Sequence, residues 1–272
     1  MTHADGYFAI GKTHTVCQDY VRHGNLPNGM AYAIVSDGCS SSKDTDIGAR
    51  ILVCMAERYL QGIPEDPDEI RFDLVIEMAR LVVKTMCGLD CTCLDATLLI
   101  AIETKTQILV FKMGDGVVSS RLRDGSWEYE YHEFTSGAPY YPNYLGDEPR
   151  RFAYMAQAND PVVYNIGGSV TNKFKHTSTV DDHIANMGMC SIYNKSDVDL
   201  VVLMTDGACS FRSGLEPVMV HDIVKQIVDV KATAGEFMVR RAKRFLGSYC
   251  ATQGWHHDDD FGVGAIFVDE AC

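Results

Sequence analysis

The chain has 272 residues, of which 46% are apolar and 22% are charged. This balance excludes a largely disordered or collagen-like protein, and the length allows one large domain or two small ones. With 37 acidic and 24 basic residues the formal net charge is −13, which argues against general attraction to nucleic acid or to anionic membranes. A phosphorylated substrate is not excluded, because acidic residues can hold cations and cations can hold phosphate.

The first elements predicted along the chain are two strands, over 7–13 and 30–36. A helix follows from about residue 44, and its apolar stripe is predicted to be Ile47, Ile51, Leu52, Met55 and Tyr59. A second helix is predicted over about 68–87, with the stripe Ile70, Leu74, Met78, Leu81 and Val82.

The middle of the chain is predicted to be a meander of strands. Runs over 97–103 and 107–112 are separated by three residues, which predicts a hairpin and hence antiparallel pairing. A third strand is predicted over 117–123. From about 137 to 198 the pattern weakens into a stretch rich in Tyr, Asn, Gly and Pro, and we expect an irregular flap with some strands there.

Regular patterns return with a strand over 199–205, helices over 216–230 and 234–249, and a last strand over 261–268. Strands with hairpin-length links exclude a Rossmann sheet, which needs alternating helical crossovers. Two helix pairs and antiparallel strands instead predict a layered α+β sandwich with the sheets inside. No linker clearly separates two domains, so we expect residues 1–272 to form a single domain with the flap as an insertion.

The ten cysteines and the N-terminal residues indicate the compartment. Cys54 and several others lie in apolar stretches, where a free thiol packs as a small apolar group. Cys91 and Cys93 lack the spacing of a zinc or redox pair. The N-terminus does not have the pattern of a signal peptide, and no apolar run approaches the ~18 residues of a membrane span. A cytoplasmic protein that is not bound to a membrane is therefore expected.

Aspartates recur where apolar strands end. Asp37, Asp115 and Asp206 each follow a strand and precede glycine, a run of three aspartates precedes the last strand, and Asp19 lies near the start. Asp-Gly is also the commonest turn dipeptide, so each one alone can be a turn. Several converging carboxylates would repel one another unless cations neutralised them, and Mg²⁺ and Mn²⁺ prefer such oxygen-rich sites. The pattern therefore points to a candidate metal site.

These motifs, in this order, resemble those of the PP2C, or PPM-type, metal-dependent protein serine/threonine phosphatases, and in particular their bacterial branch. The motifs are GKTHTVCQD at 11–19, VSDGCSS at 35–41, DIGAR at 46–50, DATLL at 95–99, GDG at 114–116, MTDG at 204–207 and DDDF at 258–261. The resemblance implies a four-layer α-β-β-α sandwich, in which two antiparallel sheets are flanked by helix pairs. This agrees with the sandwich predicted from the elements.

The resemblance also implies two Mn²⁺ or Mg²⁺ ions. Asp37 would bridge them and the carbonyl of Gly38 would serve one, Asp206 and Asp259 would complete the other, and Asp19 would bind a metal or its waters. Within 258–260 the family pattern favours Asp259, with Asp260 as its neighbour. For Asp115 we expect a structural turn. Asp95 could reach a third, weaker metal site, but packing of Thr97 in the sheet is the expected role of the DATLL motif.

The implied activity is hydrolysis of phosphoserine and phosphothreonine in a phosphoprotein, opposing a serine/threonine kinase. Asp37 and Asp206 would act through a metal-bridging water, and no cysteine or serine nucleophile is required. Many members have an arginine where His14 stands, so His14 is the candidate for binding the substrate phosphate. Many also have a histidine where Cys39 stands.

Two alternatives stay open at this point. One is a pseudophosphatase that acts as a binding or regulatory module, suggested by His14 and by the substitutions Ala96 and Gly262 in family motifs. Retention of the aspartates argues against it. The other is an unrelated carboxylate-rich metal hydrolase.

Overall fold

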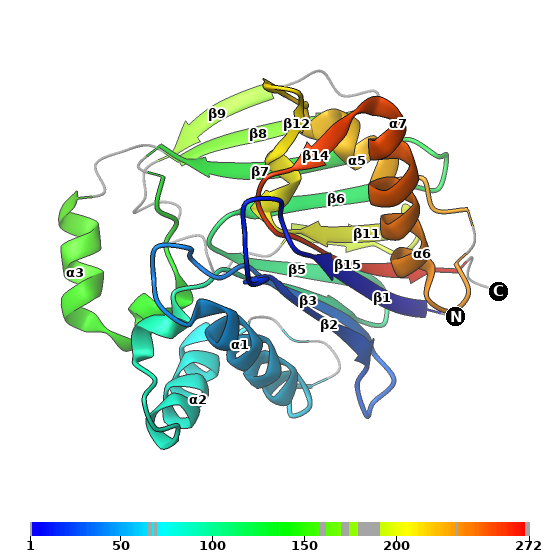
Figure 1. Ribbon diagram of the computed structural model, residues 1–272. Helices are drawn as coiled ribbons and strands as arrows, with labels where there is room; N and C mark the ends of the chain where they lie inside the picture. Colours follow the sequence, from blue (N-terminus) through cyan, green and yellow to red (C-terminus); the bar gives the residue numbers. More distant parts are fainter. Residues whose placement is uncertain are drawn as a thin grey trace.

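Two antiparallel sheets lie face to face in the computed structural model (Figure 1). The structure describes residues 2–64, 67, 70–135, 137–157, 162–169, 174–178, 191–231 and 233–269. The seven-stranded sheet has the order β1 (Thr2–Ala9), β15 (Phe261–Val268), β11 (Val198–Met204), β6 (Gly116–Leu122), β7 (Trp127–Phe134), β8 (Val162–Gly168) and β9 (Phe174–Ser178). The five-stranded sheet has the order β10 (Ser191–Asn194), β5 (Gln107–Met113), β4 (Leu98–Glu103), β3 (Ala31–Ser36) and β2 (Tyr20–Asn25).

Helices cover the outer faces of both sheets (Figure 1). On the five-stranded sheet lie α1 (Thr45–Leu60) and α2 (Phe72–Thr85), and on the seven-stranded sheet lie α5 (Val220–Val228) and α6 (Phe237–Arg244). The short helix α7 (Ala251–Gln253) follows them in the chain and has no buried residue. A π-helix over Phe245–Cys250 joins α6 to α7. The predicted four-layer sandwich is therefore confirmed.

Three apolar layers hold the sandwich together. Small side chains such as Ala33, Val35 and Val201 fill the space between the sheets. Outside them, Val53 and Leu60 of α1 pack on the five-stranded sheet in one layer, and α5 and α6 pack on the seven-stranded sheet in the other. Burial of this apolar surface is the main favourable contribution to folding.

The predicted helical stripes were correct only in part. On α1 the buried residues include Ala49, Leu52, Val53, Ala56 and Leu60, so small alanines face the core where larger side chains were expected. On α2, Leu81 of the predicted stripe is exposed. Met55 and Tyr59 of the predicted stripe are only partly buried, whereas Leu52 and Ile70 are buried as predicted.

The N-terminal strand and the flap also differ from prediction. Strand β1 begins at Thr2, earlier than predicted, and pairs with β15 over all eight of its residues. Strand β2 was not predicted, because its sequence YVRHGN is largely polar, as suits a strand at a sheet edge. The flap contributes a 3₁₀ turn (Pro142–Gly146), helix α3 (Glu148–Gln157), and strands β8, β9 and β10, which extend the two sheets. Residues 179–190 lie outside the described part of the chain.

A third sheet of three short strands lies beside the seven-stranded sheet. It consists of β13 (Glu216–Pro217), β12 (Phe211–Ser213) and β14 (Trp255–His257). Every cysteine among the described residues is free. Within the same residues, helices with the length and apolar composition needed to cross a membrane are absent.

Gly48 lies where α1 meets the 3₁₀ turn Cys91–Leu94. A Cβ at Gly48 would lie 1.7 Å from the carbonyl oxygen of Cys93, a backbone atom that cannot move aside cheaply. Gly48→Ala is therefore expected to lower the free energy of unfolding by about 3 kcal/mol. Gly247 in the π-helix is the matched control, since a Cβ there meets no atom within 4 Å. Gly247→Ala should be neutral or stabilising by up to about 1 kcal/mol. Urea unfolding measures both, and equal effects would contradict the packing argument.

Candidate metal centre

Three aspartates from different strand ends meet at one end of the sandwich. Asp37 follows β3, Asp206 follows β11, and Asp115 stands in the turn between β5 and β6. Their carboxylate oxygens lie within 4.8 Å of one another, and all three side chains are half-buried. The cluster therefore draws on both sheets, which the backbone hydrogen bonds of the strands hold in place.

The backbone around Asp37 is fixed by the neighbouring DATLL motif. Thr97 receives the Asp37 N–H on its hydroxyl at 3.0 Å and returns its own N–H to the Asp37 carbonyl at 2.8 Å. Gly38 bridges to Ala96, and a Cβ on Gly38 would lie 2.8 Å from the carbonyl oxygen of Thr45. Glycine is thus required where the loop presses against the start of α1. The arrangement agrees with the packing role expected for Thr97.

Asp19 lies buried beside this cluster. Its Oδ2 accepts a hydrogen bond from the Thr205 hydroxyl at 2.7 Å, and that hydroxyl accepts the Gly262 N–H at 2.9 Å. A Cβ on Gly262 would stand 3.1 Å from Asp19 Oδ2, so this glycine leaves room for the carboxylate. Asp19 Oδ1 is buried and has no hydrogen-bond partner among the described residues. A buried oxygen without a partner is costly, so this atom needs a ligand.

Burial and mutual repulsion raise the pKa values of the cluster. Burial raises the pKa of Asp37, and the charges of Asp19 and Asp115 raise it further. Asp206 has a raised pKa for the same reasons, with Asp37 and Asp115 as its neighbours. Burial raises the pKa of Asp115 to about 6, and the charge of Asp259 contributes.

The donor set fits a hard divalent cation. Carboxylate oxygens that repel one another, together with the partnerless Asp19 oxygen, match the ligand preferences of Mg²⁺ and Mn²⁺. A bound cation would compensate the charge that burial and proximity make unfavourable.

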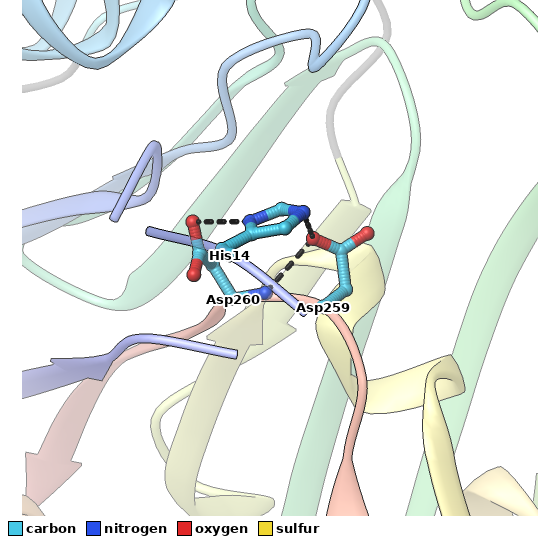
Figure 2. A group of neighbouring side chains, drawn as sticks. All are labelled: His14, Asp259 and Asp260. Atoms are coloured by element: carbon cyan, nitrogen blue, oxygen red, sulfur yellow. Dashed lines mark hydrogen bonds and ion pairs between the residues drawn. The ribbon is translucent and has the colours of Figure 1, made fainter. Parts of the chain in front are cut away.

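A second group, His14 with Asp259 and Asp260, borders the cluster (Figure 2). His14 Nδ1 lies 3.0 Å from Asp260 Oδ2, and His14 Nε2 lies 3.4 Å from Asp259 Oδ1. Burial lowers the pKa of His14, but the hydrogen bond and charge of Asp260 and the charge of Asp259 outweigh it, so the pKa is raised. His14 therefore lies between two carboxylates that favour its protonated form.

The two aspartates beside His14 have different environments. The Asp260 side chain is 1% exposed and accepts the backbone N–H groups of Gly11 (2.7 Å) and Gln18. It thus fastens the loop that carries His14. The Asp259 side chain is 41% exposed, so it remains accessible to a ligand. Asp259 stays the candidate metal ligand that the resemblance implies.

Side chains of the protein itself bind the Asp95 carboxylate. Its carboxylate accepts two hydrogen bonds from Arg150 of α3, at 2.9 and 2.7 Å, and others from Asn143 and Ser42. The side chain is 3% exposed. These bonds join the flap to the loop that follows Asp37, which is a structural role.

Among the expected site residues, Asp37 and Asp206 lie in one cluster, and Asp19 and Asp259 act on it electrostatically. Asp115, for which a structural turn was expected, stands in a turn and also joins this cluster. The available signal was the same one that marked Asp37 and Asp206, an aspartate between an apolar strand and a glycine.

Cys39 lies nearby, with Sγ 3.0 Å from the Ser41 hydroxyl. Hydrogen bonds from Ser41 and Tyr141 outweigh burial and lower the pKa of the Cys39 thiol.

Comparisons with known proteins bear on the family and on the fold. Residues 10–135 match the family model for protein phosphatase 2C. A bacterial serine phosphatase structure is 9% identical, with 100% of each chain covered and a TM-score of 0.62. The serine/threonine phosphatase Stp1 from Staphylococcus aureus is 8% identical, with 99% of this chain and 96% of that chain covered and a TM-score of 0.60.

A serine/threonine phosphatase from S. agalactiae is 12% identical, with 99% of this chain and 100% of that chain covered and a TM-score of 0.57. None of the curated proteins compared with this chain matches it. The resemblance seen in the sequence is therefore confirmed: the chain matches the protein phosphatase 2C family over residues 10–135 and has the fold of bacterial serine/threonine phosphatases.

Proposed function

We propose that the protein is a metal-dependent protein phosphatase that hydrolyses phosphoserine and phosphothreonine. The observation that carries the proposal is the convergence of Asp37, Asp115 and Asp206, with ligand oxygens within 4.8 Å of one another, in a chain with the family match and the fold of such enzymes. Two Mn²⁺ or Mg²⁺ ions would be held by Asp37, the Gly38 carbonyl, Asp206 and Asp259, with Asp19 as a ligand to an ion or its waters. When bound, the ions supply a water of lowered pKa and neutralise charge on the phosphoryl oxygens.

The residues of the chain prepare this site before any ion binds. Thr97 fixes the backbone of Asp37, and Thr205 orients Asp19. Asp260 fastens the loop 11–18, which brings His14 to the rim beside Asp259. Asp115, close to Asp37 and Asp206, is a candidate ligand for a third, weaker ion.

The proposed substrate is a phosphoprotein, and the proposed partner in the cell is an opposing serine/threonine kinase. The family match supports this substrate class. The unpaired cysteines of the described residues support a reducing compartment, so we propose the cytoplasm.

The proposal is tested by measuring hydrolysis of p-nitrophenyl phosphate and of a phosphothreonine peptide at increasing Mn²⁺ or Mg²⁺. Turnover is expected to saturate with metal and to stop when a chelator is added. Saturable metal binding without turnover on either substrate would overturn the enzyme proposal and favour a binding module of the same fold. Absence of metal binding would overturn the metal centre itself.

His14 is proposed to bind the substrate phosphate. We expect His14→Ala to raise KM for the phosphothreonine peptide roughly 10- to 150-fold, because a hydrogen bond to a charged group contributes about 1.5–3 kcal/mol. His14→Arg should keep KM within about threefold of the wild-type value, since guanidinium also binds phosphate. Steady-state kinetics at saturating Mn²⁺ measure both variants. An unchanged KM in His14→Ala would show that this side chain only fastens Asp259 and Asp260.

A further inference from the structure

A basic hollow lies on the outer helical layer, between the end of α5 and the C-terminal half of α6. Its volume is about 120 Å³, and four cationic residues line it: Lys231, Arg240, Arg241 and Arg244. Of its lining residues in the described part of the chain, Asp229 alone is acidic. In a protein of net charge −13, a hollow with a local excess of three positive charges is a marked departure from the average surface.

The arginines of this hollow are partly fixed in advance. The Arg241 side chain is 12% exposed, lies 3.7 Å from Asp229 Oδ2, and donates to the Gln226 side chain at 3.2 Å. Arg240 donates to the Ala234 carbonyl at 2.7 Å. Arg244 is exposed, and its guanidinium has no hydrogen-bond or ion-pair partner within the described residues. An ordered guanidinium beside an uncommitted one is suited to binding a phosphate group bidentately.

Stabilisation of a helix end does not explain these cations. Basic residues are favourable in the last turn of a helix because they interact with unpaired carbonyl groups. Helix α6 does not end after Arg244, however, because the chain continues through the π-helix Phe245–Cys250 into α7. Its carbonyls are taken up by the following helical turns, as when the Phe245 N–H donates to Ala242 and Arg241.

A second hollow of about 280 Å³ adjoins the first, since Arg241 and Arg244 line both. Its other walls include Phe245, Tyr249 and the hydroxyls of Ser248 and Thr252. The π-helix supplies three of these residues, and π-helical turns are rare and are found frequently at functional sites. The two hollows together fall within the range of about 300–1,000 Å³ that is typical of small-ligand sites.

We propose that these adjoining hollows form a binding site for a phosphate ester that carries a flat ring system, the chemistry of a nucleoside monophosphate. The phosphate occupies the basic hollow between Arg240 and Arg244, and the ring lies against Tyr249 in the second hollow. This site stands on the outer face of α6, whereas the aspartate cluster lies at the strand ends. The inference does not rest on the phosphatase proposal, because it uses none of the residues of that cluster.

The test is titration calorimetry of the full chain in EDTA with adenosine 5′-monophosphate, inorganic phosphate and adenosine as separate probes. Chelation suppresses binding of the phosphate to metal ions at the aspartate cluster. Saturable binding of the monophosphate is expected, with at least 10-fold weaker binding of phosphate alone and of adenosine alone. Arg244→Ser should weaken binding of the monophosphate at least 10-fold.

Lys243→Ser is the matched control, because Lys243 neighbours Arg244 in the same helix but its Nζ lies over the Tyr7 ring, 5.9 Å from the centroid. The affinity of Lys243→Ser for the monophosphate should stay within twofold of the wild-type value. No saturable binding, or equal affinity of wild type and Arg244→Ser, would overturn the proposed site. Phosphate binding as tightly as the monophosphate would overturn the role of the second hollow. Loss of binding in Asp206→Asn, with Arg244→Ser unaffected, would place the ligand at the aspartate cluster and overturn the proposal.

Discussion

Asp37→Asn is expected to lower phosphatase activity at least 10³-fold and, at the same time, to stabilise the metal-free protein. The loss of activity follows because Asp37 is the proposed ligand shared by both ions, and neutralising it removes a charge that the metal centre needs. The gain in stability follows because Asp37 is repelled by Asp19 and Asp115 when no cation is bound.

The stabilisation of the metal-free protein by Asp37→Asn should depend on pH. An aspartate with a raised pKa binds its proton more tightly in the folded state than in the unfolded chain. The metal-free wild-type protein should therefore lose stability as the pH rises from about 4, the unfolded value, through the raised pKa values of the cluster. The stabilisation by Asp37→Asn should accordingly be small at pH 4 and large at pH 8.

Thermal unfolding in EDTA at both pH values, together with hydrolysis of p-nitrophenyl phosphate in Mn²⁺, measures the two effects. Asp124→Asn is the matched control, since Asp124 also precedes glycine but stands in the exposed turn between β6 and β7. Its hydrogen bonds to Ser126 can be kept by asparagine, so both activity and stability should stay near wild type. An Asp37→Asn variant that is less stable in EDTA at pH 8 would contradict the repulsion argument.

Asp95→Asn is expected to lower the free energy of unfolding by about 3 kcal/mol. The Asp95 carboxylate is 3% exposed and is paired with Arg150, so the substitution leaves a partly buried guanidinium without its counter-charge. Hydrogen bonds from Asn143 and Ser42 are weakened by the same change. The consequence should extend to the flap, because Arg150 and Asn143 belong to it.

Urea unfolding measures the stability, and limited proteolysis between 137 and 157 reports on the flap. Cleavage there should be faster in Asp95→Asn than in wild type. Asp73→Asn is the control, because Asp73 pairs with Arg71 at the surface, where both side chains are about half exposed. Exposed pairs contribute at most about 1 kcal/mol, so this variant should unfold near the wild-type midpoint. Equal losses in the two variants would contradict a structural role for Asp95.

The sequence was sufficient for the architecture because its strands and helices have clear and different periods. The last strand was predicted over its full length, and the hairpin between β4 and β5 followed from the three-residue link. The predicted stripe of α1 was correct at Leu52 but missed Ala49 and Ala56, because periodicity weights large apolar residues. Strand β2 was missed because an edge strand does not need a continuous apolar run.

The sequence predicted site residues that a single motif marks. It was less informative about contacts between residues of different motifs. Asp37 and Asp206 were identified from their positions after apolar strands. Asp115 has the same local signal, but only the packing of the two sheets shows that it lies within 4.8 Å of the others. The engagement of His14 by Asp259 and Asp260 likewise depends on contacts between segments 245 residues apart or more, which local patterns do not contain.

The hydrogen bond from Gly11 to Asp260 spans 249 positions of the sequence, and among the described strands β1 pairs with β15 alone. During synthesis, the segment that carries His14 leaves the ribosome before its partner and cannot contact it until residue 260 has been made. At about 5–20 residues per second, this delay lasts on the order of 10–50 seconds. The loop that carries His14 is therefore fastened beside Asp259 only after residue 260 has been made, and a shorter nascent chain has no complete His14 group.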